Sequence, residues 1–268
     1  MDTSSEVRLN LDAGSDDVGT FVQGHEFNSD GTKVFVISQN GTFNIHTLTT
    51  PYDISNFSQD ADDGVSDYKT AFSAGDGDVR PRDITFNNDG TKMYFVDGGN
   101  NQIADGGVVE YDLSTPFVPS TATFVNELVV STELSLFEQD VEFDDDGTRM
   151  YVTEATTAPS TNYIYVYKLS TPFAVSSSKY VGKYQIAYRG STAETGAGYT
   201  FQFGKQGMKL YLTTNEFTHI GGVDTIYDDV IYEYDLSCPY GVVICEEDTV
   251  SNTSAQVDVA KQAIHQNS

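Results

Sequence analysis

The chain has 268 residues and a mass of 29.3 kDa, enough for one large domain or two small ones with a substantial core. Its 40 acidic and 14 basic residues give a formal net charge of −26, which opposes nucleic-acid binding because phosphates are neutralised by Lys and Arg. No apolar stretch approaches the roughly 20 residues that span a bilayer, and the first residues lack the basic and apolar segments of an export signal. We therefore expect neither membrane insertion nor signal-dependent export of the chain as written.

A short hairpin motif recurs along the chain. It begins with Phe27-Asn-Ser-Asp-Gly-Thr-Lys, returns at Phe86 and at Phe143, and has a weaker fourth copy from Phe203. The turn glycines of the four copies are spaced about 59 residues apart. Asp-Gly between aromatic and β-branched runs is a strong hairpin signal, because glycine supplies the positive φ of a tight turn. Each copy therefore predicts a first and a second strand.

A second motif follows the first in every repeat. It ends in Thr-Pro-Tyr at Tyr52, in Thr-Pro-Phe at Phe117 and Phe173, and in Cys-Pro-Tyr at Tyr240. The alternating run before the proline predicts a third strand, which the proline ends because it has no N–H to donate. A further extended run, such as residues 122–130 or 180–188, predicts a fourth. Four antiparallel strands per repeat are typical of a β-propeller blade.

The two ends of the chain predict how the ring closes. Residues 5–12 resemble the end of a fourth strand, whereas the last repeat stops after its third. We expect residues 5–12 to complete the final blade, giving an all-β, four-bladed β-propeller over residues 1–245. Residues 246–268 are then a polar C-terminal tail with a short docking helix.

The Phe-x-x-Asp-Gly-Thr-Lys pattern resembles the repeats of TolB-type and YVTN-type propellers. Paired with Tyr-Asp-Leu-Ser-Thr-Pro-Phe, it is similar to repeats found in proteins of marine bacteria and their phages. The resemblance implies a propeller fold. It does not imply one activity, since such propellers include enzymes, ligand binders and virion components.

The first strand of a blade lines the central channel of a propeller, so equivalent positions just before the repeated Phe are candidates for a site. Two acidic residues, Asp83 and Asp140, would converge there and offer oxygen ligands to a hard cation such as calcium. The alternative is that Asp83 pairs with Arg82 or caps a turn. The candidate channel residues are Gln23, Arg82, Asp83, Gln139 and Asp140.

An acidic loop in the first repeat is a second candidate calcium site. Its carboxylates are dense, but their spacing departs from the EF-hand loop, and a solvated loop is the alternative. The candidate ligands are Asp60, Asp62, Asp63 and Asp67. The aspartates of the Asp-Gly turns are instead expected to bond their own backbone. No other cofactor is indicated.

The sequence contains no recognisable catalytic motif. His25 and His46 fall at positions that hold apolar or aromatic residues in other repeats, so we expect both to pack within blades. His219 lies in the longest insertion. Gly-x-Ser-x-Gly, phosphate-loop and His-Glu-x-x-His patterns are all missing, which predicts that the chain is not an enzyme. Cys238 and Cys245 either form a clip after the last third strand or remain thiols.

The tail carries a short apolar stripe suited to docking in a partner's groove, formed by Val257, Ala260 and Ile264. The first hypothesis is a non-catalytic virion protein of a marine phage, such as a capsid decoration or a tail component. It would assemble in the host cytoplasm, with virion or surface proteins or its own copies as partners. The alternative is a secreted or periplasmic ligand-binding propeller or lactonase-like hydrolase, in an extracellular or cytoplasmic bacterial setting.

Overall fold

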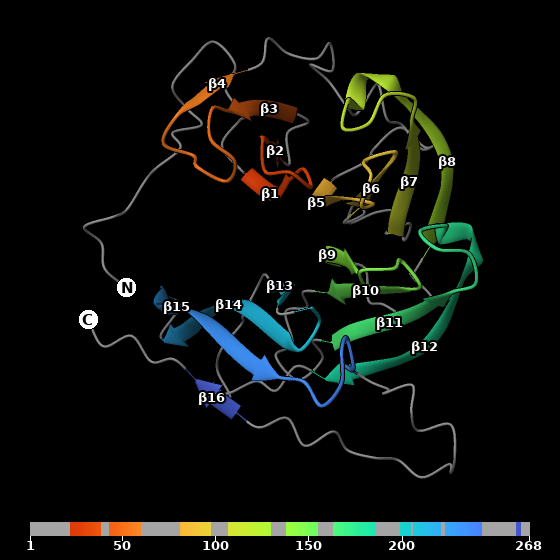
Figure 1. Ribbon diagram of the computed structural model, residues 1–268. Helices are drawn as coiled ribbons and strands as arrows, with labels where there is room; N and C mark the ends of the chain where they lie inside the picture. Colours follow the sequence, from red (N-terminus) through yellow and green to blue (C-terminus); the bar gives the residue numbers. More distant parts are fainter. Residues whose placement is uncertain are drawn as a thin grey trace. The chain divides into compact units, whose positions relative to one another are not determined.

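The computed structural model describes residues 22–38, 43–59, 81–97, 107–129, 138–154, 163–185, 199–204, 206–220, 223–242 and 261–263. These residues form four sheets of four strands, with consecutive strands as neighbours (Figure 1). The all-β prediction is therefore confirmed. The strands of the first two sheets are β1 (Val22–Phe27), β2 (Lys33–Ser38), β3 (Phe43–Leu48), β4 (Phe57–Gln59), β5 (Pro81–Phe86), β6 (Lys92–Asp97), β7 (Gly107–Leu113) and β8 (Ala122–Val129). Those of the last two are β9 (Glu138–Phe143), β10 (Arg149–Glu154), β11 (Tyr163–Leu169), β12 (Ser178–Gln185), β13 (Tyr199–Gly204), β14 (Lys209–Ile220), β15 (Val223–Asp235) and β16 (Lys261–Ala263).

The hairpin between the first two strands of a repeat is held by its own polar side chains. In the second repeat, Asn87 Oδ1 accepts the Lys92 N–H at 2.9 Å, and Asp89 Oδ1 accepts both the N–H and the hydroxyl of Thr91. These hydrogen bonds lower the pKa of Asp89, as the equivalent ones do for the pKa of Asp30 and of Asp146. The turn aspartates thus bond locally, as the sequence predicts.

The two motifs of a repeat are in contact: the aromatic ring that follows the proline of the second motif packs on the turn glycine of the first. The aromatic residue after the proline adopts a left-handed backbone, with φ of 56° at Phe117, and its N–H donates to Gly90 O at 3.0 Å. A Cβ on Gly90 would lie 2.3 Å from the Phe117 ring, so no other residue fits beneath it. The same arrangement joins Tyr52 to Gly31, Phe173 to Gly147 and Tyr240 to Gly207. We call these four contacts the ring–glycine contacts.

The link between the third and fourth strands is a short 3-10 turn in two repeats, η2 (Pro119–Thr121) and η4 (Val175–Ser177). In the last sheet the fourth strand is instead β16, which pairs antiparallel with residues 232–234 of β15. The tail was expected to contain a helix, yet residues 261–263 form a strand. A strand satisfies the open backbone groups of a sheet edge, whereas a short isolated helix is only marginally stable. Residues 5–12, predicted for this edge, lie outside the described residues.

The chain divides into two compact units, Met1–Val141 and Glu142–Ser268, each with its own core. In the first unit, the core lies between the first and second sheets and contains Phe35, Ile84, Met93 and Phe95. In the second unit, a core of aromatic and aliphatic side chains joins the third and fourth sheets. The predicted division at residue 245 and the number of blades in a ring remain predictions. No helix among the described residues is long and apolar enough to cross a membrane.

Candidate functional site

The first strands of the first two sheets place the predicted channel residues together. The pairing of β1 with β2 shifts register at Gln23, and that of β5 with β6 shifts at Arg82. Such irregularities redirect a side chain out of the strand alternation. Here they allow Arg82 Nη1 to donate to Gln23 Oε1 at 2.9 Å. This contact joins β1 to β5 across 59 residues of sequence.

Gly24 lets the two strands approach closely. A Cβ at this position would lie 2.7 Å from Asp83 Oδ1 and 2.8 Å from Asp83 Cα. A side chain would therefore displace Asp83. The other oxygen of Asp83, Oδ2, accepts the Val141 N–H at 3.3 Å, so this carboxylate connects β5 to β9. The Asp83 carboxylate thus bonds the backbone of a neighbouring strand. The alternative interpretation, in which it pairs with Arg82, stays a prediction.

Glu26, on β1, has a strongly perturbed carboxyl group. Its Oε1 accepts the Phe27 N–H at 3.1 Å. The side chain keeps partial contact with solvent, but protein surrounds most of it, and burial raises its pKa from 4.5 to about 7. The charge of Asp140, itself 5% exposed, contributes a smaller part of this rise in the pKa of Glu26, and the hydrogen bond from Phe27 opposes it. We refer to Glu26, Asp83 and Asp140 as the carboxylate group.

The sequence identified two members of this group and missed Glu26. Glu26 precedes the repeated Phe directly, where Thr85 and Glu142 stand in the next repeats. A polar residue there looks like ordinary solvated strand surface. What distinguishes Glu26 is its burial and its proximity to the charge of Asp140 on another strand. The residues next to Glu26 in the sequence do not indicate either property.

Several predicted site residues lie outside the described residues. These are the acidic-loop aspartates Asp60, Asp62, Asp63 and Asp67, the tail residues Val257, Ala260 and Ile264, and the side chain of Gln139. In the part of the chain that is described, no group of three or more His, Cys, Asp or Glu side chains is arranged to hold a metal ion. The calcium hypothesis for Asp83 and Asp140 therefore gains no support from their geometry.

The histidines behave differently from one another. His46 is 3% exposed, consistent with the predicted packing position. His25 is exposed, although Ile84 and Val141 at the equivalent positions are buried. The expectation that His25 packs within a blade is therefore wrong; an imidazole is readily hydrated, whereas the aliphatic side chains are not. The side chain of His219 is outside the described set.

Cys238 is disulfide-bonded, and the chain has one other cysteine, Cys245. Of the two alternatives left open by the sequence, the disulfide is the one found at Cys238, whereas Cys245 lies outside the described residues. Cys238 stands directly before Pro239 and Tyr240, whose ring forms the fourth ring–glycine contact. The disulfide therefore anchors the last of these turns.

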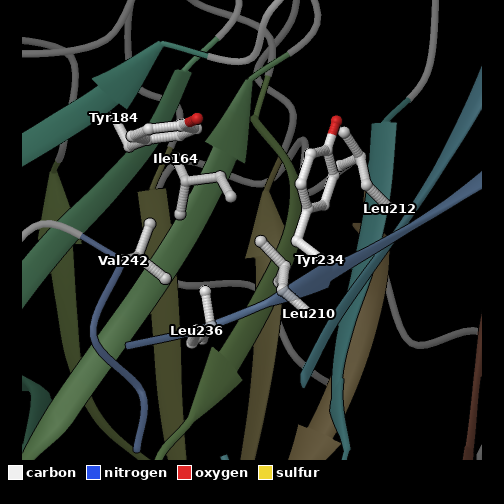
Figure 2. Close-up of a pocket in the computed structure, with 7 residues that line it drawn as sticks. All are labelled: Ile164, Tyr184, Leu210, Leu212, Tyr234, Leu236 and Val242. Atoms are coloured by element: carbon white, nitrogen blue, oxygen red, sulfur yellow. The ribbon is translucent and has the colours of Figure 1, made fainter. Parts of the chain in front are cut away.

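An apolar gap in the second unit is not a ligand site. Figure 2 shows it between the third and fourth sheets, with the hydroxyls of Tyr184 and Tyr234 at one side. Its other lining residues are Ile164, Leu210, Leu212, Leu236 and Val242. The free space between these side chains holds little more than a water molecule. In the first unit, a larger residue, Phe95, stands at the position equivalent to Leu212, and Met93, of about the same size as leucine, stands for Leu210. The gap is a packing defect of the core.

No protein-family model and no curated protein sequence matches the chain. Solved structures of propeller type do match. They include a thermostable family-43 glycoside hydrolase, with a TM-score of 0.50, 15% identity and coverage of 82% of this chain and 70% of that one. A periplasmic gluconolactonase from Pseudomonas aeruginosa has a TM-score of 0.42 and 11% identity, over 80% of this chain and 66% of that one. The β-propeller domain of Cps50 (Swd1) from Myceliophteria thermophila has a TM-score of 0.41 and 8% identity, over 89% of this chain and 58% of that one.

These comparisons support a propeller-type fold and correct one prediction. The chain was expected not to be an enzyme because catalytic motifs are missing. The matched family-43 glycoside hydrolase shows that hydrolases occur on this type of fold, so the exclusion was wrong. It failed because catalytic carboxylates contributed by separate strands need no contiguous motif. The chain spans between 54% and 66% of the length of three matched structures. The comparisons give no support to a virion role.

Proposed function

We propose that this protein is a hydrolase that cleaves a sugar-derived substrate, a glycoside or a sugar lactone, by acid–base chemistry at the carboxylate group. The observation that carries the proposal is the Glu26 carboxyl, with a pKa of about 7, next to the buried carboxyl of Asp140. Two carboxyl groups in unlike environments can act as acid and base in one reaction. The glycoside hydrolase and lactonase matches are compatible with this proposal at the level of fold.

Each member of the group has a distinct part in the proposed reaction. Glu26 is the general acid: at neutral pH a large fraction of it carries a proton, which it can give to the departing oxygen. Asp83 accepts a backbone N–H, which stabilises the ionised carboxylate. An ionised carboxylate can activate water or stabilise positive charge on the sugar ring. Asp83 is the proposed base; burial keeps Glu26 protonated, and the charge of Asp140 adds to this effect.

The polar pair beside this group would orient the substrate. Arg82 and Gln23 hold each other through one hydrogen bond, and each carries further polar atoms suited to sugar hydroxyls. An amide and a guanidinium together offer donors and an acceptor. Binding through side chains fixed by mutual contact costs less ordering entropy.

The proposal is tested by assaying the purified chain on aryl glycosides and on aldonolactones. Activity should fall as pH rises through about 7, because the general acid Glu26 loses its proton. Glu26→Gln should lower kcat by about 10²-fold or more. Asp235→Asn, which changes an exposed carboxylate on β15, is the matched control and should leave kcat unchanged. An active wild type whose Glu26→Gln and Asp235→Asn variants behave alike would contradict the assignment, as would inactivity on both substrate classes.

We also propose that the protein works in an oxidising compartment. The supporting observation is the disulfide of Cys238, since such bonds persist mainly outside the reducing cytosol. This proposal agrees with the secreted or periplasmic alternative. Neither it nor the hydrolase proposal requires a virion.

A further inference from the structure

Exposed apolar side chains are concentrated on two strands. Seven large hydrophobic residues are exposed among those described, and five of them lie on β8 or β12. They are Phe124, Val125, Val129, Tyr180 and Val181. Both strands have eight residues, and each is the last strand of its sheet. Exposed apolar surface gathered in one place, rather than scattered singly, marks an interaction site.

The same local irregularity creates both surfaces. The pairing of β7 with β8 skips Val125, and that of β11 with β12 skips Val181. Each skipped residue is the extra residue of a bulge, which breaks the normal alternation of side chains. As a result, two adjacent side chains face solvent in each strand: Phe124 with Val125, and Tyr180 with Val181.

The aromatic member of each pair is held in place from below. The Phe124 ring packs edge-on against buried Tyr111, with centroids 5.9 Å apart. The Tyr180 ring packs in the same way against buried Tyr167, at 5.7 Å. Rings already fixed in one orientation lose little entropy on binding, which makes them effective anchors. A bulge also prevents a continuous backbone ladder, so contact here would be made by side chains.

The two strand pairs differ in charge. β7 and β8 contain Glu110, Asp112 and Glu127 and no basic residue. Glu110 is buried and paired with Lys92 of β6, so the acidic side chains that a partner can reach are Asp112 and Glu127. β11 and β12 contain Lys168, Lys179 and Lys183 and no acidic residue. In a chain with 40 acidic and 14 basic residues, an all-basic strand pair is a local reversal of charge.

We propose that the bulged edge of β8 on one copy of this chain binds the bulged edge of β12 on a second copy. The apolar pairs form the centre of the contact, and the lysines of β12 face Asp112 and Glu127 around it. Edge-to-edge contacts of like kind, β12 with β12 or β8 with β8, would place like charges opposite each other and are disfavoured. Because the two surfaces differ, each dimer keeps one free surface of each kind, and assembly continues beyond the dimer.

Sedimentation velocity over a range of concentrations tests the proposal. Wild type should form a concentration-dependent series of oligomers, which weakens as salt is raised. Two variants reverse one side each: Asp112→Lys with Glu127→Lys makes the β8 edge basic, and Lys179→Glu with Lys183→Glu makes the β12 edge acidic. Each variant alone should associate at least about tenfold more weakly than wild type, because both of its edges then carry charge of the same sign. An equal mixture of the two variants should recover assembly, since opposite charges meet again.

The mixing experiment separates this contact from other causes. Met208→Ser alters an exposed apolar residue in the turn before β14 and should leave association unchanged. Far-ultraviolet circular dichroism checks that each variant is folded. A wild type that stays monomeric at every concentration would overturn the proposal. So would variants that associate like wild type, or a mixture that does not recover, since a different surface would then be responsible.

Discussion

Replacing Gly90 by alanine is expected to lower the free energy of unfolding of the first unit by about 2–4 kcal/mol. Two effects add. Gly90 has φ of 69°, and an alanine in the left-handed region costs about 1–2 kcal/mol. The new methyl group would also stand 2.3 Å from the Phe117 ring, which must move.

The cost of moving that ring follows from its contacts. Phe117 packs against Phe86 with centroids 5.3 Å apart and against Phe35 at 6.4 Å. Aromatic pairs of this kind contribute about 0.5–1.5 kcal/mol each beyond burial, so weakening both accounts for the upper part of the expected range.

Urea unfolding of Gly90→Ala, Phe117→Ala and the double variant measures the two effects separately. Without the ring, the Gly90 change should cost about 1–2 kcal/mol, which is the backbone part alone. If the two substitutions are additive within error, the ring does not rest on the glycine and the reasoning fails. A loss below 1 kcal/mol for Gly90→Ala would refute it as well.

Three further predictions concern the carboxylate group, the apolar gap and the disulfide. Because Glu26 holds a proton more tightly when folded, the free energy of unfolding should fall as pH rises from 4.5 to about 7 and then level off. The free energy of unfolding should fall by about 2 kcal/mol in total over this pH range, after allowing for solvent screening. In urea unfolding, Glu26→Gln should not show this dependence on pH. Leu212→Phe, which places the residue of the second repeat in the gap, should raise the melting temperature; a decrease would show that the gap cannot accept the ring. Native protein should give no reaction with a thiol reagent, and reduction should release two thiols and lower stability by about 2–3 kcal/mol; reactive thiols before reduction would contradict the disulfide.

The strands were largely predictable because each repeat contains the same two motifs, the Asp-Gly turn and the proline followed by an aromatic residue. The run expected at residues 122–130 is β8, Ala122–Val129, and the hairpin at Gly90 is where the Asp-Gly pair places it. Turn chemistry is local, so four copies of one motif give four independent readings of the same geometry. The left-handed backbone of Phe117 was not predictable, because a bulky residue adopts that conformation only when its surroundings compensate the strain.

The candidate site was predictable in part for a related reason. Equivalent positions in a repeat bring Arg82 and Gln23 to neighbouring strands, and counting back from the repeated Phe finds them. The pKa of Glu26 depends on burial and on Asp140, which is 114 positions away in the sequence. Neither quantity leaves a trace in the residues around Glu26. The tail strand β16 was missed because pairing with an available edge outweighed the weak local preference of its residues.

The ring–glycine contacts also bear on how such a chain can change during evolution. A substitution at either partner is harmful unless the other changes with it, so the two motifs of a repeat must be inherited as a block. The segments between the second and third strands lie outside this constraint, and their lengths already differ: β14 and β15 form a hairpin of 12 and 13 residues, whereas β2 and β3 have six each. Insertions at these hairpin ends would leave the joined turns intact. New specificity is therefore expected to arise there by lengthening loops, with the blade itself copied unchanged.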